Sequence, residues 1–311
     1  MENKTYGEIL RKLQNYHYQK MKKIRRRHLV ASVKKAPLQE GIRVSTRKER
    51  IVISLATYPP RFASIDLPLK SLLLQSVKPD KILVWVPCAL SKLPQNMRKF
   101  EEYGVSFRKA PHDFYSHLKY FYTLQEYAND IVITVDDDAI YPPDLISTLI
   151  HTHNRHPSCI CARRVHQITW NKEGNINPYT QWHWIQRNIR TPSIDLFAVG
   201  VGGVLYPPHS LHIDPLSYTL FTKLCPKQDD LWLKWQEMLQ GLDVVWAPNS
   251  LPDPPLADAS QNVSLVEANV HHGENDKAIK ALSDYFGPIA PSGIIRRPIR
   301  HDHVLASTCL L

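Results

Sequence analysis

The stretch IVITVDDDAIYPPDL, residues 131–145, joins a strand pattern directly to a cluster of acids. Residues 131–135 are all β-branched, the composition of a strand that is buried on both faces. Asp136, Asp137 and Asp138 follow at once, and adjacent carboxylates repel one another unless a cation or several N–H donors compensate them. The stretch therefore predicts a buried strand that ends in a cation site. An acidic turn capping the helix near Asp144 is the alternative.

Strand and helix patterns alternate before this stretch. The predicted strands of the first half are 50–61, 80–87, 105–110 and 130–138. The predicted helices between them are 66–76, 96–104 and 116–128. This alternation implies an α/β fold with a mostly parallel sheet, which is flanked by helices and binds ligands at the carboxyl ends of its strands. The three aspartates lie at such an end.

The second half is less regular, and we expect it to shape a substrate pocket. Its predicted elements are helix 144–156, strand 159–165, helix 228–241, strand 243–248 and helix 275–287. With 311 residues, 43% of them hydrophobic, the chain suffices for one large domain or two modest ones. Its apolar runs are far shorter than the roughly 20 residues that cross a bilayer, and its first residues lack an apolar signal core, so we expect a cytosolic chain.

The positive charge is concentrated at the N-terminus. The net charge is +10, yet residues 1–50 hold 15 Lys or Arg against 4 Glu, a surplus of 11, and the remainder is nearly neutral. Residues 1–49 are predicted to form a basic helical arm with a looser link through Pro37 and Gly41, separable from the strand series. An anionic membrane surface is the favoured partner of this arm, no nucleic-acid partner is expected, and a solvated tail is the alternative.

The cysteines do not indicate a disulfide framework, because five of them are scattered through a large chain. His153, His156, Cys159 and Cys161 are close in sequence, but their spacing fits none of the common zinc patterns. Alternating cysteines also suit a strand with one inward face. We therefore expect free thiols.

The acid cluster favours Mg²⁺ or Mn²⁺, which take carboxylate oxygens and fill their other positions with water and substrate phosphates. The sequence has no G-x-x-x-x-G-K-[ST] loop and no kinase-type glycine-rich loop, so transfer of a phosphoryl group from ATP lacks its phosphate cradle. A nucleotide diphosphate that acts as a leaving group is compatible with both observations.

Several segments, in this order, resemble the GT-A glycosyltransferases, especially the family 2-like enzymes that build bacterial surface polysaccharide and lipopolysaccharide. The matching segments are SLATYPPRFASIDLPLKSLLLQSVKPDKILVWV (54–86), ITVDDDAIYP (133–142), GVGGVLYPP (200–208), QDDLW (228–232) and VHHGEND (270–276). The resemblance implies a catalytic domain at 50–290, with a nucleotide-binding half at 50–138 and an acceptor half at 139–290, followed by a tail at 291–311. It also implies a metal-dependent transferase with a nucleotide-sugar donor, UDP being the first choice, and a glycan or lipid-linked glycan acceptor.

By position, the resemblance also assigns roles to the acid cluster. Asp136 corresponds to the nucleoside contact, and Asp138 corresponds to the metal ligand, assisted by Asp137. His271 or His272 takes the place of a late metal-binding histidine, with a surface residue as the alternative.

Donor contacts are implied for Thr57, Tyr58 and Arg61 in the first strand-to-helix turn, where the family holds the base and the ribose. Lys119 is placed like a phosphate or sugar contact, or is a solvated helix lysine. Gly202 and Gly203 would let the backbone approach the sugar, or form a plain turn. Family 2 enzymes commonly have an acid after the second strand that binds uracil, and this chain has none there, which leaves the base open.

The acceptor side is rich in aromatic and amide side chains, which suit sugar rings and hydroxyls, although buried core residues are the alternative reading for each. These residues are Trp170, Asn171, Tyr179, Gln181, Trp182, His183 and Trp184.

An inverting transfer needs a base for the acceptor hydroxyl, and Asp229 and Asp230 form the next pair of carboxylates. They lie at the start of a predicted helix, whose dipole keeps a carboxylate ionised, although the place also suits an N-cap. We take Asp229 as the base and Asp230 as the second choice. Two other classes of function remain open, a metal-dependent phosphodiesterase or pyrophosphatase and a non-catalytic protein that binds glycan or nucleic acid.

Overall fold

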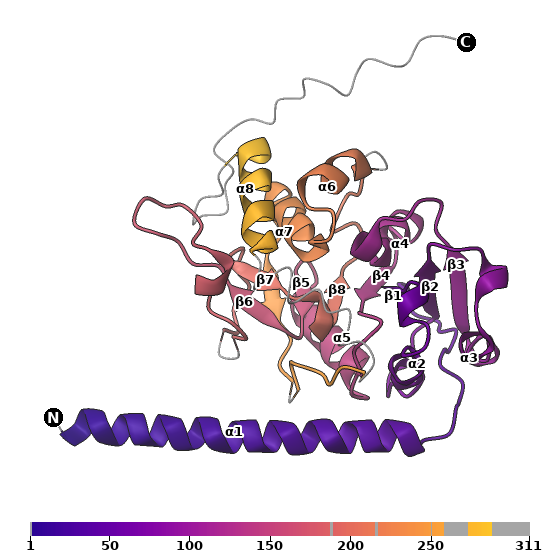
Figure 1. Cartoon of the computed structure of the whole chain (residues 1–311), viewed down its shortest axis with the longest axis horizontal. Helices are drawn as coiled ribbons and strands as arrows, with labels where there is room; N and C mark the ends of the chain where they lie inside the picture. The colour runs from indigo at the N-terminus through magenta and orange to yellow at the C-terminus, as the bar shows by residue number, and fades with distance from the viewer. Residues whose placement is uncertain (1, 187–188, 215–216, 250, 258–272, 288–311) are drawn as a thin grey trace, which may run out of the picture.

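A seven-stranded sheet runs through the centre of the molecule in the computed structural model, which describes residues 2–186, 189–214, 217–249, 251–257 and 273–287 (Figure 1). The strands are β1 (Ile51–Ala56), β2 (Lys81–Val86), β3 (Val105–Lys109), β4 (Ile131–Thr134), β5 (Ile160–Ala162), β8 (Val204–Tyr206) and β9 (Val244–Trp246). Their order is β3-β2-β1-β4-β8-β5-β9. β8 is antiparallel to both of its neighbours, and all other pairs are parallel.

The predicted fold class is therefore confirmed: a mostly parallel α/β sheet with flanking helices. A second, two-stranded antiparallel sheet pairs β6 (Val165–Gln167) with β7 (Leu196–Ala198). The predicted strand 159–165 is thus divided between two sheets, β5 in the first and β6 in the second.

Helices cover both faces of the large sheet. On one face lie α2 (Asp66–Leu73), α3 (Gln95–Arg98) and α5 (Leu145–Arg155), and on the other lie α4 (Phe121–Glu126), α6 (Tyr218–Leu224), α7 (Asp229–Leu239) and α8 (Glu274–Phe286). Short 3₁₀ turns connect them: η1 (Pro59–Arg61), η2 (Leu90–Lys92), η3 (Glu101–Tyr103), η4 (Tyr115–Lys119), η5 (Tyr179–Gln181) and η6 (Gly200–Gly202).

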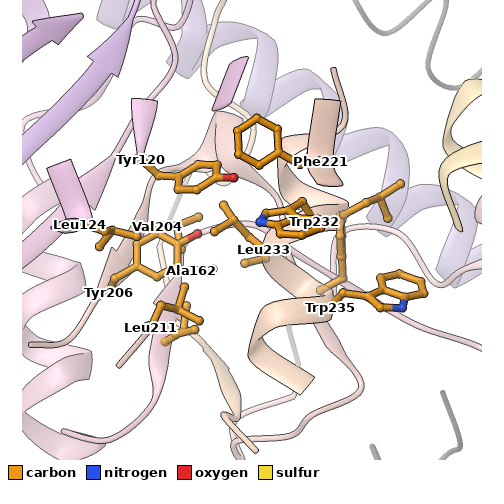
Figure 2. Packing of buried hydrophobic residues seen from close by; sticks show 14 of the residues in the cluster. Tyr120, Leu124, Ala162, Val204, Tyr206, Leu211, Phe221, Trp232, Leu233 and Trp235 are labelled. Atoms are coloured by element: carbon orange, nitrogen blue, oxygen red, sulfur yellow. The ribbon is translucent and has the colours of Figure 1, made fainter. Parts of the chain in front are cut away.

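The core under α7 is built from large aromatic side chains (Figure 2). Trp232 and Trp235 of α7 are 2% and 0% exposed, and Phe221 of α6 packs edge-on against Trp232. Burial of so much apolar surface fixes α7 against the sheet. The start of α7, which carries the acid pair, is held in place by this packing.

The predicted helix 116–128 is interrupted. Residues 115–119 form η4, and α4 begins only at Phe121, because Tyr120 leaves helical geometry with φ −120° and ψ −34°. The Tyr120 ring is fully buried in the aromatic core. The break places Lys119 at the end of a tight turn with a side chain only 7% exposed, so the reading of Lys119 as a solvated helix lysine is wrong.

The basic arm is a long helix, α1 (Glu2–Lys35), that lies along one side of the molecule (Figure 1). The sequence predicts an arm that is separable from the strand series, and in the structure Leu29 and Val33 of α1 are buried against Ile140 and Leu251. The link that follows is also fixed, and its Gly41 N–H donates to the Tyr103 carbonyl at 2.9 Å. No described helix combines the length and the apolar character that crossing a membrane requires.

Candidate active site

Arg61 meets the acid cluster at the carboxyl ends of β1 and β4. These two strands pair in parallel up to Ser54 and Thr134, so the segments that follow them emerge side by side. The Arg61 Nη1 atom lies 2.5 Å from Asp138 Oδ2 and 3.4 Å from Asp137 Oδ1. Burial lowers the pKa of Arg61, but the charges of the two carboxylates outweigh it and raise the pKa. Arg61 thus supplies a permanent cation inside the cluster.

Lys119 joins the acid cluster to the acid pair of α7. Its Nζ lies 2.9 Å from Asp136 Oδ1, 2.7 Å from Asp229 Oδ2 and 3.7 Å from Asp230 Oδ1. Burial lowers the pKa of this ammonium, but the carboxylates outweigh it and raise the pKa well above its ordinary value. Two acidic motifs that lie far apart in the sequence therefore form one site around a single charged lysine.

The two acids of α7 have different environments. The Asp229 side chain is 9% exposed; burial raises its pKa, but the charge of Lys119 outweighs burial and holds the pKa below its ordinary value. The Asp230 side chain is 28% exposed, and burial together with the neighbouring carboxylates raises its pKa to about 7. Asp230 also accepts the Gly200 N–H at 2.9 Å through Oδ2. A carboxyl with a pKa near 7 is suited to taking up a proton.

Neither acid serves as the helix cap that the sequence left as an alternative. The N-cap of α7 is Gln228, and no side chain forms the cap hydrogen bond there. Asp144 does occupy the N-cap position of α5, but its side chain forms no cap hydrogen bond, and its Oδ1 lies 3.0 Å from Arg163 Nη1.

The glycines of the segment 200–203 have separate functions. A Cβ on Gly202 would lie 2.6 Å from the Arg164 Cβ, and Gly203 has φ +88° with Leu145 2.5 Å from its ideal Cβ position. Both are therefore required by packing and backbone shape. Gly200 is the glycine that faces the site, because its ideal Cβ position lies 2.6 Å from Lys119 Nζ and 2.7 Å from Asp230 Oδ1.

The variant Gly200→Ala should accordingly lose activity, because the added methyl group would push the Lys119 side chain and the Asp230 side chain apart. We expect turnover to fall about tenfold or more, because even a small displacement of reacting groups lowers the rate by such a factor. Gly174→Ala is the control, since Gly174 has φ +77° but no atom within 4 Å of the added Cβ. It should lower the melting temperature and leave turnover unchanged. Equal turnover in both variants would contradict this function of Gly200.

Tyr141 was not identified from the sequence, although it follows the aspartates by only three residues. Its hydroxyl accepts the Asp136 N–H at 2.9 Å and donates to the Val201 carbonyl at 3.2 Å. The tyrosine therefore ties the acid cluster to the segment 200–203. The tyrosine of AIYPP was a visible signal, but only the fold shows what its hydroxyl contacts.

His117 also was not identified. It is fully buried beside Asp229, with Nδ1 2.8 Å from the Tyr120 hydroxyl and Nε2 2.8 Å from the Cys225 carbonyl oxygen. The carbonyl can only accept, so Nε2 carries the proton and Nδ1 accepts from Tyr120. Burial lowers the pKa of His117 to about 4, so this histidine is neutral and braces the site.

The carboxylates fit a divalent ion of the kind the sequence predicts. Asp137 Oδ2 is buried without a hydrogen-bond partner, and the Asp138 side chain is 17% exposed beside it. One or two carboxylates are the usual protein contribution to a Mg²⁺ site, the rest coming from water and phosphate. Within the described ranges, no three His, Cys, Asp or Glu side chains converge as a ready-made cage. His271 and His272 lie outside the described residues.

The remaining predicted residues are only partly brought to the site. Thr57 is buried under the cluster, and its N–H donates to the Trp85 carbonyl at 3.0 Å. Tyr58 precedes η1, and its carbonyl accepts the Arg61 N–H at 2.8 Å. Their predicted contacts to base and ribose stay predictions.

On the acceptor side, Tyr179 and Trp182 are buried core residues, whereas the Trp184 ring is 39% exposed. The inner face of Trp184 stacks on His166 with centroids 5.1 Å apart. Burial and the charge of Asp230 raise the pKa of Tyr179.

The four cysteines that the structure describes, Cys88, Cys159, Cys161 and Cys225, are free thiols. Cys159 and Cys161 are both buried and contribute to the same core, which confirms the inward-facing strand pattern. Burial raises the pKa of Cys161 to about 12, so this thiol is not ionised. The zinc alternative has no support among the residues that the structure describes.

No protein-family model matches the sequence, and no curated protein is similar to it. The fold is similar to the mannosyltransferase PcManGT of Pyrobaculum calidifontis in complex with GDP-Man and Mn²⁺, with a TM-score of 0.45 and 12% identity over 86% of this chain and 74% of that one. It is also similar to S. aureus TarS in complex with UDP-GlcNAc, with a TM-score of 0.43 and 12% identity over 76% of this chain and 80% of that one.

A third similar structure is CMP:2-keto-3-deoxy-manno-octonic acid synthetase in complex with CTP, with a TM-score of 0.41 and 12% identity over 72% of this chain and 99% of that one. All three of these structures hold a nucleotide or a nucleotide sugar. At such low identity the likeness concerns the general fold, and the activity has to be argued from the site.

Proposed function

We propose that the chain is an inverting glycosyltransferase that moves a sugar from a nucleotide diphosphate, UDP being the first choice, to the hydroxyl of a growing bacterial surface glycan. One observation carries the proposal: Lys119 holds the acid cluster after β4 and the acid pair of α7 in a single site. The first group suits the diphosphate side of a donor, and the second suits the hydroxyl side of an acceptor.

Asp230 is the base of the proposed reaction. The acceptor oxygen forms a bond to the anomeric carbon of the donor sugar as its proton passes to an Asp230 oxygen, and the bond from that carbon to the diphosphate oxygen breaks. The Gly200 N–H holds Asp230 Oδ2, which leaves Oδ1 for the proton. Asp229 keeps its charge against Lys119 and fixes the ammonium. This assignment reverses the order of preference taken from the sequence.

Arg61 and Lys119 provide the permanent positive charge of the site. The departing diphosphate gains negative charge, and fixed cations in a mostly buried site stabilise it strongly. Asp138 and Asp137 would hold a Mg²⁺ or Mn²⁺ ion, whose chemistry is charge neutralisation on the same diphosphate.

The acceptor would lie against Trp184, since the outer face of this ring is open and a sugar ring can stack on it. A lipid-linked glycan acceptor would place the enzyme in the cytoplasm, peripheral on the inner face of the membrane.

Nucleotide binding is tested by thermal shift with UDP, GDP and CMP, and with their sugar conjugates, each with Mn²⁺ or with EDTA. We expect one nucleotide diphosphate with Mn²⁺ to raise the melting temperature by several degrees, because a ligand of the native state stabilises it. Asp138→Ala should remove the part of this rise in melting temperature that depends on Mn²⁺. Asp66→Ala is the control, since Asp66 is an exposed acid whose ion pair is with Lys99 and not with a residue of the site.

The same panel, incubated without an acceptor, separates the proposal from a pyrophosphatase or phosphodiesterase. A transferase should leave the nucleotide sugar largely intact until an acceptor glycan is added. Rapid acceptor-independent release of nucleotide monophosphate would show that the site activates water, and the transferase proposal would then be wrong.

A further inference from the structure

The long helix α1 has two different faces where its side chains are described, from residue 16 to residue 35. Its inner face carries Leu29 and Val33, buried on the body. Arg26 donates to the Pro254 carbonyl at 3.2 Å, and Lys22 pairs with Asp253. The helix therefore has a fixed rotation about its own axis, and its outer side is defined.

The charged residues of the outer face are all basic. Residues 16–35 contain eight Lys or Arg and no acid. At 3.6 residues per turn, the positions that lie opposite the face of Leu29 and Val33, or flank it, carry a row of exposed cations. The members of this basic row are Lys20, Lys23, Arg27, Lys34 and Lys35. A helix that is only a solvated strut normally alternates acids with bases, and this one does not.

Two exposed apolar or aromatic side chains lie on the same side as the basic row. Ile24 is 50% exposed in the middle of the row, and Tyr16 is 69% exposed beyond its N-terminal end. An isoleucine among lysines has no partner in water or on a phosphate backbone. It does have one at the boundary between lipid headgroups and acyl chains, where amphipathic basic helices insert their apolar residues.

The basic row is also straight and unobstructed. α1 lies along one side of the molecule, with the sheet and the other helices on its inner side (Figure 1). Its 34 residues extend about 50 Å at 1.5 Å per residue, so a flat surface can contact the whole row without meeting another described element.

From these observations we propose that the outer face of α1 binds an anionic membrane surface, with the basic row at the headgroups and Ile24 at the acyl boundary. The proposal is independent of the transfer reaction, because it uses no residue of the site. It also fixes the orientation of the enzyme, since α1 lies parallel to the membrane and the sheet stands away from it. A nucleic acid would use the same charges but not Ile24, so it is the competing outcome.

The test is sedimentation of the full chain with vesicles of phosphatidylcholine that contain phosphatidylglycerol, and with vesicles of phosphatidylcholine alone. The variant Lys20→Gln/Lys23→Gln/Arg27→Gln/Lys35→Gln removes four charges and keeps good helix formers. Each lysine or arginine near such a surface strengthens binding roughly fivefold, so the variant should bind anionic vesicles at least about a hundredfold more weakly.

The matched control removes four exposed cations elsewhere, at Lys48, Lys92, Arg108 and Lys109. It should pellet like wild type. The wild type should ignore phosphatidylcholine vesicles and be released by about 1 M salt, where the screening length is about 3 Å. Circular dichroism checks that both variants stay folded.

A second variant separates lipid from nucleic acid. Ile24→Ser should weaken vesicle binding several-fold and leave binding to a polyuridine RNA unchanged. The proposal is overturned if the quadruple α1 variant pellets like wild type, or if wild type ignores anionic vesicles and binds the RNA instead.

Discussion

Replacement of Asp230 by asparagine should lower turnover at least about a hundredfold while the affinity for the nucleotide donor stays near that of the wild type. The amide keeps the shape of the side chain and its contact with Gly200, but it cannot take up the proton of the acceptor hydroxyl. The measurements are initial rates of product formation with a saturating acceptor, and calorimetry of donor binding with Mn²⁺.

Asp229→Asn is the matched control, one residue away in the same helix. It removes a charge that holds Lys119 at 2.7 Å, so it should lower the melting temperature more than Asp230→Asn does and lower turnover less. The reverse pattern, with turnover lost in Asp229→Asn and kept in Asp230→Asn, would restore the assignment suggested by the sequence.

The pH dependence gives a second readout of the same residue. The pKa of Asp230 is raised to about 7, and a base must be deprotonated to act. In the free enzyme, kcat/KM should therefore rise with pH through about 7 and level off above it. A profile of kcat/KM that is flat between pH 5 and pH 8 would contradict this assignment, because the pKa of about 7 lies inside that interval.

The second large effect is expected from Lys119→Met, which removes the cation shared by Asp136 and Asp229. Removal of one partner of a buried ion pair costs about 3–5 kcal/mol, because the remaining charge stays buried and unpaired. At neutral pH the melting temperature should fall by about 5–10 °C. Lys99→Met is the control, since Lys99 and its partner Asp66 are 38% and 39% exposed, and an exposed pair contributes less than about 1 kcal/mol.

The fall in melting temperature caused by Lys119→Met should depend on pH in a defined direction. In the wild type, the pKa of Asp229 is held below its unfolded value, so its stabilisation is present above that unfolded pKa and is lost as pH falls through the folded pKa. Without Lys119, burial dominates and raises the folded pKa above the unfolded one. Stability is then greatest at low pH and declines as pH rises. The difference in melting temperature between the two proteins should thus narrow on acidification, and a constant difference would contradict this explanation.

Much of the fold was predictable because the strands β1, β2 and β4 are continuous apolar runs separated by helical patterns. No strand was predicted at β8, and nothing local in the sequence indicates that this segment enters the sheet between β4 and β5, antiparallel to both. The break of the helix at Tyr120 depends on packing in the aromatic core, and the local sequence does not indicate it either.

The candidate site was predictable where its functional residues are adjacent in the sequence. Asp136, Asp137 and Asp138 and the pair Asp229 and Asp230 are visible as clusters of acid. The bridge by Lys119 and the approach of Gly200 depend on tertiary packing, as does the difference in exposure that favours Asp230 over Asp229. The sequence motifs predicted the acidic residues of the site, and only the fold shows which cation each of them contacts.

The pairing of Lys22 with Asp253 has a consequence for the order in which the chain is made. These residues are separated by 231 positions, so α1 leaves the ribosome long before its docking partner exists. At about 5–20 residues per second, the delay is about 10–50 s. Throughout that time Leu29 and Val33 lack Leu251, one of the residues on which they pack, so the packing of the newborn helix is incomplete. α1 is therefore synthesised well before Asp253, and its docking is completed only late in synthesis.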